Sequence, residues 1–273
     1  MKKTNQLVSA PSQEVANALA QGFPQDLGFT RINLPRLAMV SQDKTSGRGK
    51  SMVVEQEAGT FLKEYQTEEL GDNGKPLWAK DEIGSEIEGT IVFQRRQLKY
   101  YDSATEKFTS STIYDSNDDI IPLFSSGEEV ARGTAVELKA KYEFVDSKDG
   151  KTKSKLEDNK VLYVLYDGEL HQMALRGSSM YACKTFLKSV PNPTIFLTKF
   201  SSEAKSKGTI DWNQMTFVNV RSLDSKEAQI VLEKQTELRE GVAQEKAYFA
   251  GQQSSPAMPT KYEVGKLMLD AVE

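Results

Sequence analysis

The chain has one cysteine, Cys183, and one histidine, His171, among its 273 residues. A single cysteine excludes an intramolecular disulfide, and the two residues are too few for a zinc site of Cys and His ligands. A Ser-His-Asp triad would depend on His171, which lies in a strand-like stretch with apolar neighbours and is more typical of a satisfied core histidine. Acidic residues are plentiful, so composition alone still permits a Mg²⁺ site made of carboxylates.

Long apolar runs are also missing. No run approaches the roughly 18 residues that a membrane-spanning helix needs. Residues 1–6 include two lysines but no apolar segment follows them, which predicts that there is no secretory signal. The hydrophobic share, 38%, is low for a globular protein. We therefore expect a soluble, cytoplasmic protein without membrane contacts, which for a viral protein means the host cell cytoplasm.

The formal net charge of −4 argues against a uniformly basic nucleic-acid-binding protein. The charge is segregated along the chain, however. Residues 160–210 contain seven Lys or Arg and three Asp or Glu, whereas residues 222–273 contain six basic and nine acidic residues. A local basic groove in an acidic protein remains compatible with this distribution, because binding depends on the field at one face.

Residues 161–190 read VLYVLYDGELHQMALRGSSMYACKTFLKSV. Asp167-Gly168 is a dipeptide typical of a two-residue type I′ hairpin turn, which predicts two antiparallel strands around it. An apolar stripe then predicts a helix over 178–190, ended by Pro191. This run therefore predicts a strand–strand–helix order in the middle of the chain.

The surrounding pattern predicts a mainly β protein. Expected strands are 86–101, 134–145, the pair within 161–176, 194–202 and 211–221. A helix between the third and fourth strands of a five-stranded barrel is the order of an OB-fold, and a two-sheet sandwich is the alternative. Asp224 and Glu227 resemble a capping box for a long helix over 224–249.

Four regions follow from this pattern. They are an N-terminal arm over 1–29, an OB-like domain with elaborated loops over 30–222, a C-terminal helix over 223–250 and a flexible tail over 251–273. The segment 30–40 is broken by Pro35, which predicts an edge strand or a strap.

Three motifs resemble those of a known family. They are INLPRLAMV at 32–40, the hairpin-to-helix run at 161–187 and GTIDWNQMTFVNV at 208–220. In their order they are similar to single-stranded-DNA-binding proteins of tailed bacteriophages, which have OB-folds. The resemblance implies a protein that coats single-stranded DNA without strong sequence preference during phage replication or recombination, with no enzymatic activity and no cofactor. The acidic end is similar in kind to tails that dock replication proteins, but it carries only Asp270 and Glu273 near its tip.

Proteins of this kind need cationic side chains along a groove and exposed rings on which bases stack. In a regular strand, Arg95, Lys99 and Tyr101 share one face, and Lys139 and Lys141 share the polar face of the next expected strand. Backbone N–H groups at the start of the helix would add to the attraction of Arg176 and Lys184 for phosphate. The candidate nucleic-acid-binding residues are Arg95, Arg96, Lys99, Tyr101, Lys139, Lys141, Arg176, Lys184 and Trp212.

Two other functions are compatible with the sequence. In a virion or assembly protein, the barrel would be an oligomerisation module, and the low cation surplus favours this alternative. A carboxylate-metal nuclease is less well supported, because Asp118-Asp119 has no partner motif at a suitable spacing. In the DNA-binding interpretation, the long helix and the tail would serve self-association or recruitment of replication or recombination proteins.

Overall fold

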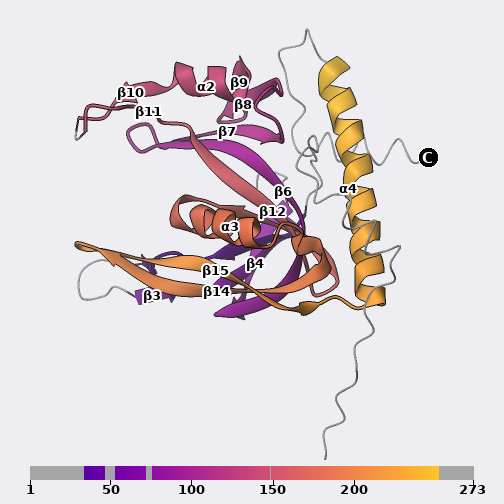
Figure 1. The fold of residues 1–273 in the computed structure, drawn as a ribbon. Helices are drawn as coiled ribbons and strands as arrows, with labels where there is room; N and C mark the ends of the chain where they lie inside the picture. Colours follow the sequence, from indigo (N-terminus) through magenta and orange to yellow (C-terminus); the bar gives the residue numbers. More distant parts are fainter. Residues whose placement is uncertain (1–33, 47–52, 72–75, 148, 252–273) are drawn as a thin grey trace, which may run out of the picture.

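The computed structural model describes residues 34–46, 53–71, 76–147 and 149–251 (Figure 1). The expectation of a mainly β protein with a few helices is confirmed for these residues. The strands are β1 Arg36–Met39, β2 Lys44–Ser46, β3 Val53–Gln56, β4 Phe61–Leu70, β5 Pro76–Gly84, β6 Glu86–Asp102, β7 Lys107–Tyr114, β8 Ile121–Ser125, β9 Glu128–Gly133, β10 Glu143–Val145, β11 Thr152–Ser154, β12 Glu157–Tyr166, β13 Glu169–Leu175, β14 Phe196–Lys207 and β15 Ile210–Ser222. The helices are α2 Ala135–Lys141, α3 Gly177–Ser189, the short 3₁₀ helix η2 Pro193–Ile195 and α4 Ser225–Gly251. The expected arm and tail lie outside the described residues.

One large mixed sheet organises the molecule. Its strand order is β5-β4-β1-β13-β12-β6-β7-β8-β9, and β14, with β15 on its other side, pairs with the first part of β6. β1 is parallel to β13, and the other neighbours are antiparallel. The closed five-stranded barrel is not confirmed, because this sheet is open. The smaller pairs β2–β3 and β10–β11 stand apart from it.

The long strand β6 is the centre of this sheet, since it pairs with β12, β14 and β7. A bulge interrupts its ladder with β12, because Phe93 pairs with Tyr163 and Ile91 pairs with Val164, which leaves Val92 as the extra residue. The side-chain amide of Gln235 in α4 donates to the carbonyl of Val92 at 3.2 Å. The buried Gln235 therefore ties α4 to the bulge.

Local sequence accounts for the hairpin and the helices that follow it. Asp167 and Gly168 both have positive φ, 50° and 77°, as the predicted type I′ turn requires. α3 follows at once and buries Cys183 and Phe186 in a core shared with β12, β13, β14 and β15. The order of hairpin, helix and strand expected for residues 161–202 is confirmed.

The expected long helix is confirmed as α4, which stands along the side of the sheet (Figure 1). Its capping box is complete: Glu227 donates its N–H to Asp224 at 2.8 Å, and the Glu227 carboxylate accepts from the Asp224 N–H at 2.9 Å. The buried residues of α4 are spaced three to four apart: Ala228, Val231, Gln235, Leu238 and Val242, all apolar except Gln235. The apolar stripe therefore packs on the sheet within this chain.

Two expectations about secondary structure are wrong. Residues 135–141 form helix α2, and only Glu143–Val145 of the expected strand 134–145 is extended. Thr134 and Glu137 form a capping box, and burial of Ala135 and Leu138 against the sheet decides in favour of the helix. The segment with Pro35 is not at an edge, because β1 lies between β4 and β13.

Candidate nucleic-acid interface

Strands β12 and β6 present alternate residues to two faces of the sheet. We call one the α4 face, because its residues pack beneath α4, and the other the α3 face, because it continues into the core beneath α3. The α4 face is defined by Phe93, Arg95, Val161 and Tyr163. The α3 face is defined by Gln94, Arg96, Asp158, Lys160 and Leu162.

Three cations converge on the α3 face. Lys160 of β12 lies directly opposite Arg96 of β6, and Lys184 approaches from α3. Burial lowers the pKa of Lys160, and the positive charges of Lys184 and Arg96 lower it further, although nearby Cys183 acts in the other direction. The Lys160 ammonium donates to the side-chain oxygen of Gln94, which is polar but uncharged. The charge of this group is therefore not neutralised by its nearest hydrogen-bond partner.

Asp158 is the carboxylate at the centre of this face. It accepts from Arg96 at 3.2 Å and from the Tyr114 hydroxyl at 2.7 Å, and it forms an ion pair with Lys139 of α2. Burial would raise the pKa of Asp158, but the hydrogen bonds from Lys139 and Tyr114 and the charge of Arg96 bring it below its usual value. Asp158 is thus a carboxylate held ionised by the cations around it.

The balance of charge on the α3 face is positive. Asp158 pairs with Arg96 and Lys139, whereas no ion pair joins Lys160 or Lys184 to a carboxylate in the described part of the chain. Figure 1 shows that α3 flanks β12 and β6 along one edge of this face and that α2, with the β10–β11 hairpin, flanks them along the other edge. The cations therefore come from two neighbouring strands and from a helix on each side.

Aromatic rings accompany these cations. The rings of Tyr100 and Tyr142 have centroids 6.4 Å apart, and the Lys155 ammonium lies 5.7 Å from the Tyr100 centroid. Tyr181 of α3 is 64% exposed. The α3 face thus combines cations for phosphates with rings of the kind on which bases stack.

The α4 face uses its charge differently. Arg95 is 2% exposed, and its guanidinium donates to Asp115 at 2.9 Å and to the Ile113 carbonyl at 3.2 Å. This guanidinium is buried and paired with a buried carboxylate, so the structure gives the predicted contact residue Arg95 a role within the fold and no exposed surface for a phosphate. Arg95 holds β6 to the end of β7 and the loop that follows.

Three other predicted contact residues lie away from the cation group, which is formed by Lys160, Arg96 and Lys184; they are Lys99, Tyr101 and Arg176. Lys99 and Tyr101 share the face of Arg95, as the strand alternation predicts, and Tyr101 is 57% exposed. Burial lowers the pKa of Lys99 to about 8, helped by the charges of Arg36 and Arg176. The structure therefore divides the predicted site between two faces, with Arg96, Lys139 and Lys184 on the other side of the sheet.

The two candidates still to be placed are Lys141 of α2 and Trp212 of β15. Lys139 and Lys141 do not share a strand face, since both belong to helix α2; Lys139 contacts Asp158, while Lys141 is exposed. The indole N–H of the half-buried Trp212 donates to the Ser178 hydroxyl at 3.0 Å, which ties β15 to the start of α3. Sequence reasoning missed Lys160, although its alternation with Leu162 and Val164 places it on the buried side of β12.

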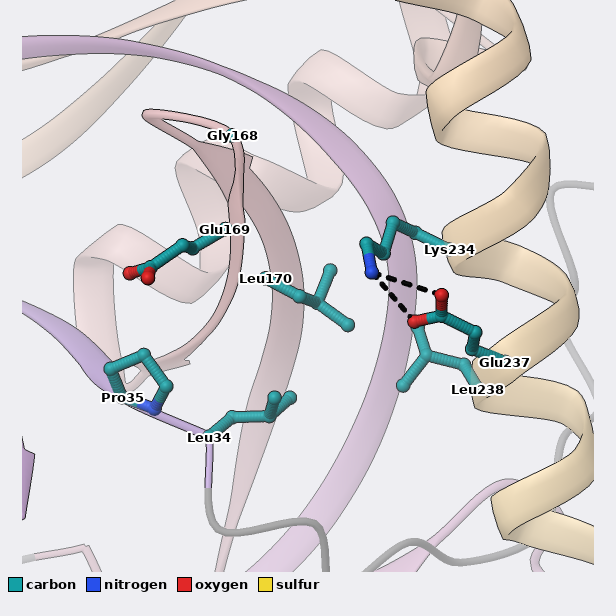
Figure 2. A pocket seen from close by; sticks show the side chains of 8 residues that line it. All are labelled: Leu34, Pro35, Gly168, Glu169, Leu170, Lys234, Glu237 and Leu238. Carbon is teal, nitrogen blue, oxygen red and sulfur yellow. Dashed lines mark hydrogen bonds and ion pairs between the residues drawn. The ribbon is translucent and has the colours of Figure 1, made fainter.

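The α4 face also contains a hollow of about 310 Å³ (Figure 2). Its lining is formed by Leu34, Pro35, Gly168, Glu169, Leu170, Lys234, Glu237 and Leu238. The Lys234 ammonium is held by Glu237 at 2.8 Å, and Glu169 is held by Lys63 at 3.1 Å. With its floor of leucines and its charges paired, this hollow offers little attraction to a phosphate.

Comparisons with protein families, curated proteins and solved structures give no match to this chain. Within the described ranges, no three His, Cys, Asp or Glu side chains are grouped so that they could hold a metal ion. The helices described there also include none with the length and apolar character needed to cross a membrane. The chemistry of the site therefore has to be judged from its own residues.

Proposed function

We propose that this protein binds single-stranded DNA without strong sequence preference through its α3 face. The observation that carries the proposal is the cation surplus around Lys160, Arg96 and Lys184, which Asp158 does not balance. Residues 161–187, one of the motifs that resemble phage single-stranded-DNA-binding proteins, contribute Lys184 and Tyr181 to this face. The proposal includes an OB-type relationship and a role in phage replication or recombination.

The physical basis is the polyanionic backbone of DNA. Each cation that contacts a phosphate releases condensed counterions, which favours binding at low salt and weakens it at high salt. A lysine that has already lost part of its hydration, as Lys160 has, gains more from a phosphate than a fully hydrated one. Binding of this kind requires no cofactor and no catalytic residue.

The test is a titration of a labelled single strand of about 30 nucleotides at two salt concentrations. We expect the double variant Lys160→Gln/Lys184→Gln to bind at least about tenfold more weakly at low salt and to show a salt slope smaller by about 1. The matched control is Lys205→Gln/Lys234→Gln, which removes the same charge from lysines already paired with Glu203 and Glu237. This control should bind like the unchanged protein.

Absence of binding by the unchanged protein at low salt would refute the proposal. If that protein instead formed large assemblies, the role in virion assembly would gain support. Equal losses in the two double variants would show that net charge, and not the α3 face, governs the interaction.

A further inference from the structure

We infer, on the basis of the proposed function, that Tyr181 is a base-stacking residue and that the ligand of the α3 face is a strand with unpaired bases. A site with cations alone would accept any polyanion. A ring that is fixed beside the cations would add selectivity for exposed bases, because every base offers a π face for stacking.

The position of Tyr181 on α3 separates it from the core. Cys183 and Phe186 are the buried side chains of this helix, and the opposite side carries Tyr181, Lys184 and Lys188. Residues three or four apart are neighbours on a helix surface, so the tyrosine ring lies one turn from Lys184. Lys184 is also the helical lysine whose charge reaches Lys160. Tyr181 therefore borders the cation group.

Packing among the described residues does not account for the exposure of this ring. Tyr181 is 64% exposed and belongs to none of the three core clusters of the described residues. A ring left in water gains nothing for folding, whereas a base that covers it gains stacking and removes apolar surface from water. Because α3 is anchored by its buried side, the ring is held on a rigid element.

The other side of the α3 face offers an instructive contrast. At the end of α2, Lys139 and the C-cap residue Tyr142 are also three residues apart, but Tyr142 is half-buried and packs against Tyr100. Tyr142 therefore has a structural role that Tyr181 lacks. Tyr181 is the ring whose removal should affect binding without affecting the fold.

The experiment compares two probes of equal charge, each about ten nucleotides long: oligothymidylate and an abasic strand with the same sugar-phosphate backbone. We expect the unchanged protein to bind oligothymidylate more tightly than the abasic strand. Tyr181→Ala should weaken binding of oligothymidylate by about fivefold or more and leave binding of the abasic strand unchanged. Tyr181→Phe keeps the ring and should bind like the unchanged protein.

The control is Phe108→Ala, which removes a ring of similar exposure, 50%, beside Lys99 and away from the α3 face. It should leave the affinity for both probes unchanged. Urea unfolding should show the same midpoint for Tyr181→Ala and the unchanged protein, which separates stacking from a structural role.

The outcomes distinguish this inference from the function on which it rests. If the unchanged protein binds neither probe at low salt, the proposed function fails. If it binds both probes equally, or if Tyr181→Ala weakens both to the same extent, DNA binding stands and the stacking role of Tyr181 is wrong.

Discussion

Arg95 and Arg96 are consecutive residues of β6, yet the molecule uses them in opposite ways. The side chain of Arg95 is fully buried and paired with a carboxylate that is nearly as buried, Asp115. The side chain of Arg96 is 35% exposed, and it shares Asp158 with Lys139. Position on the pleat, and not residue type, therefore decides whether a charge in this sheet serves folding or remains partly exposed to a ligand.

The same contrast extends over both faces. Beneath α4, the Gln235 amide donates a hydrogen bond to the Val92 carbonyl at the bulge. In the hollow beside the helix, Lys234 is paired with Glu237 (Figure 2). On the α3 face, Lys160 and Lys184 have no carboxylate partner in the described part of the chain. Arg95 and Lys234 on the α4 face are thus paired within the chain, although Lys99 lies there close to two further cations, Arg36 and Arg176. The α3 face keeps its surplus beside Arg96, between β12 and α3.

The largest expected effect comes from breaking the buried pair. Arg95→Met leaves the Asp115 carboxylate buried without its cation, and we expect a loss of about 3–5 kcal/mol in the free energy of unfolding. Arg96→Met, the matched change one residue later, should cost about 1 kcal/mol or less, because its ion pair is partly exposed. Urea denaturation of both variants measures the difference. Equal destabilisation would mean that the two faces do not differ as described.

A smaller loss is expected at the bulge. Gln235→Leu removes the amide that donates to the Val92 carbonyl and leaves a buried acceptor unsatisfied, which should cost about 1–3 kcal/mol of stability. DNA affinity of the folded variant should not change, since Gln235 lies on the α4 face. Weaker DNA binding by the folded variant would contradict the separation of the two faces.

The lowered pKa of Lys99 leads us to expect that the stability of the protein depends on pH. Its pKa in the folded protein is about 8, below the usual lysine value of 10.5, so the unfolded chain binds more protons between these values. The free energy of unfolding should therefore rise as the pH increases from 8 to 10.5, by about 1–2 kcal/mol after allowance for partial exposure. Lys99→Met, measured by urea denaturation across this range, should lose this rise. A rise that persists in the variant would assign it to another group.

For Lys160 we expect a smaller effect of pH, on the affinity for DNA. Because its pKa is lowered, Lys160 loses its charge at a lower pH than an ordinary lysine, and DNA binding should weaken by a few-fold as this proton is lost. Lys160→Arg keeps its charge at all these pH values and should bind with less dependence on pH. Anisotropy titrations between neutral and alkaline pH measure the change. An unaltered pH profile in Lys160→Arg would show that Lys160 does not contact the strand.

Local signals in the sequence predicted much of the fold. The Asp167-Gly168 turn and the Asp224–Glu227 capping box act through neighbouring residues, and both are present in the structure. Residues 134–145 were predicted as a strand because apolar and polar residues alternate there. The Thr134–Glu137 capping box was the sequence signal for helix α2. The burial of Leu138 against the sheet could not be read from the sequence.

The site was predicted only in part, for a similar reason. Strand alternation correctly separates Arg95, Lys99 and Tyr101 from Arg96, but it does not say which face α4 covers. That choice depends on contacts between β6 and a helix more than a hundred residues later, such as Gln235 with Val92. Lys160 was missed because it ends a lysine-rich segment that is typical of a solvated hairpin tip.

Lysine acetylation with and without DNA tests the central claim most directly. The protein would be treated with an amine-reactive acetyl donor, alone and with excess oligothymidylate, and the modification of each lysine would be measured by mass spectrometry. We predict that the strand protects Lys160 and Lys184, while Lys205 and Lys234 react equally in both samples. Protection of Lys99, with Lys160 and Lys184 unprotected, would contradict the assignment and place the strand on the α4 face.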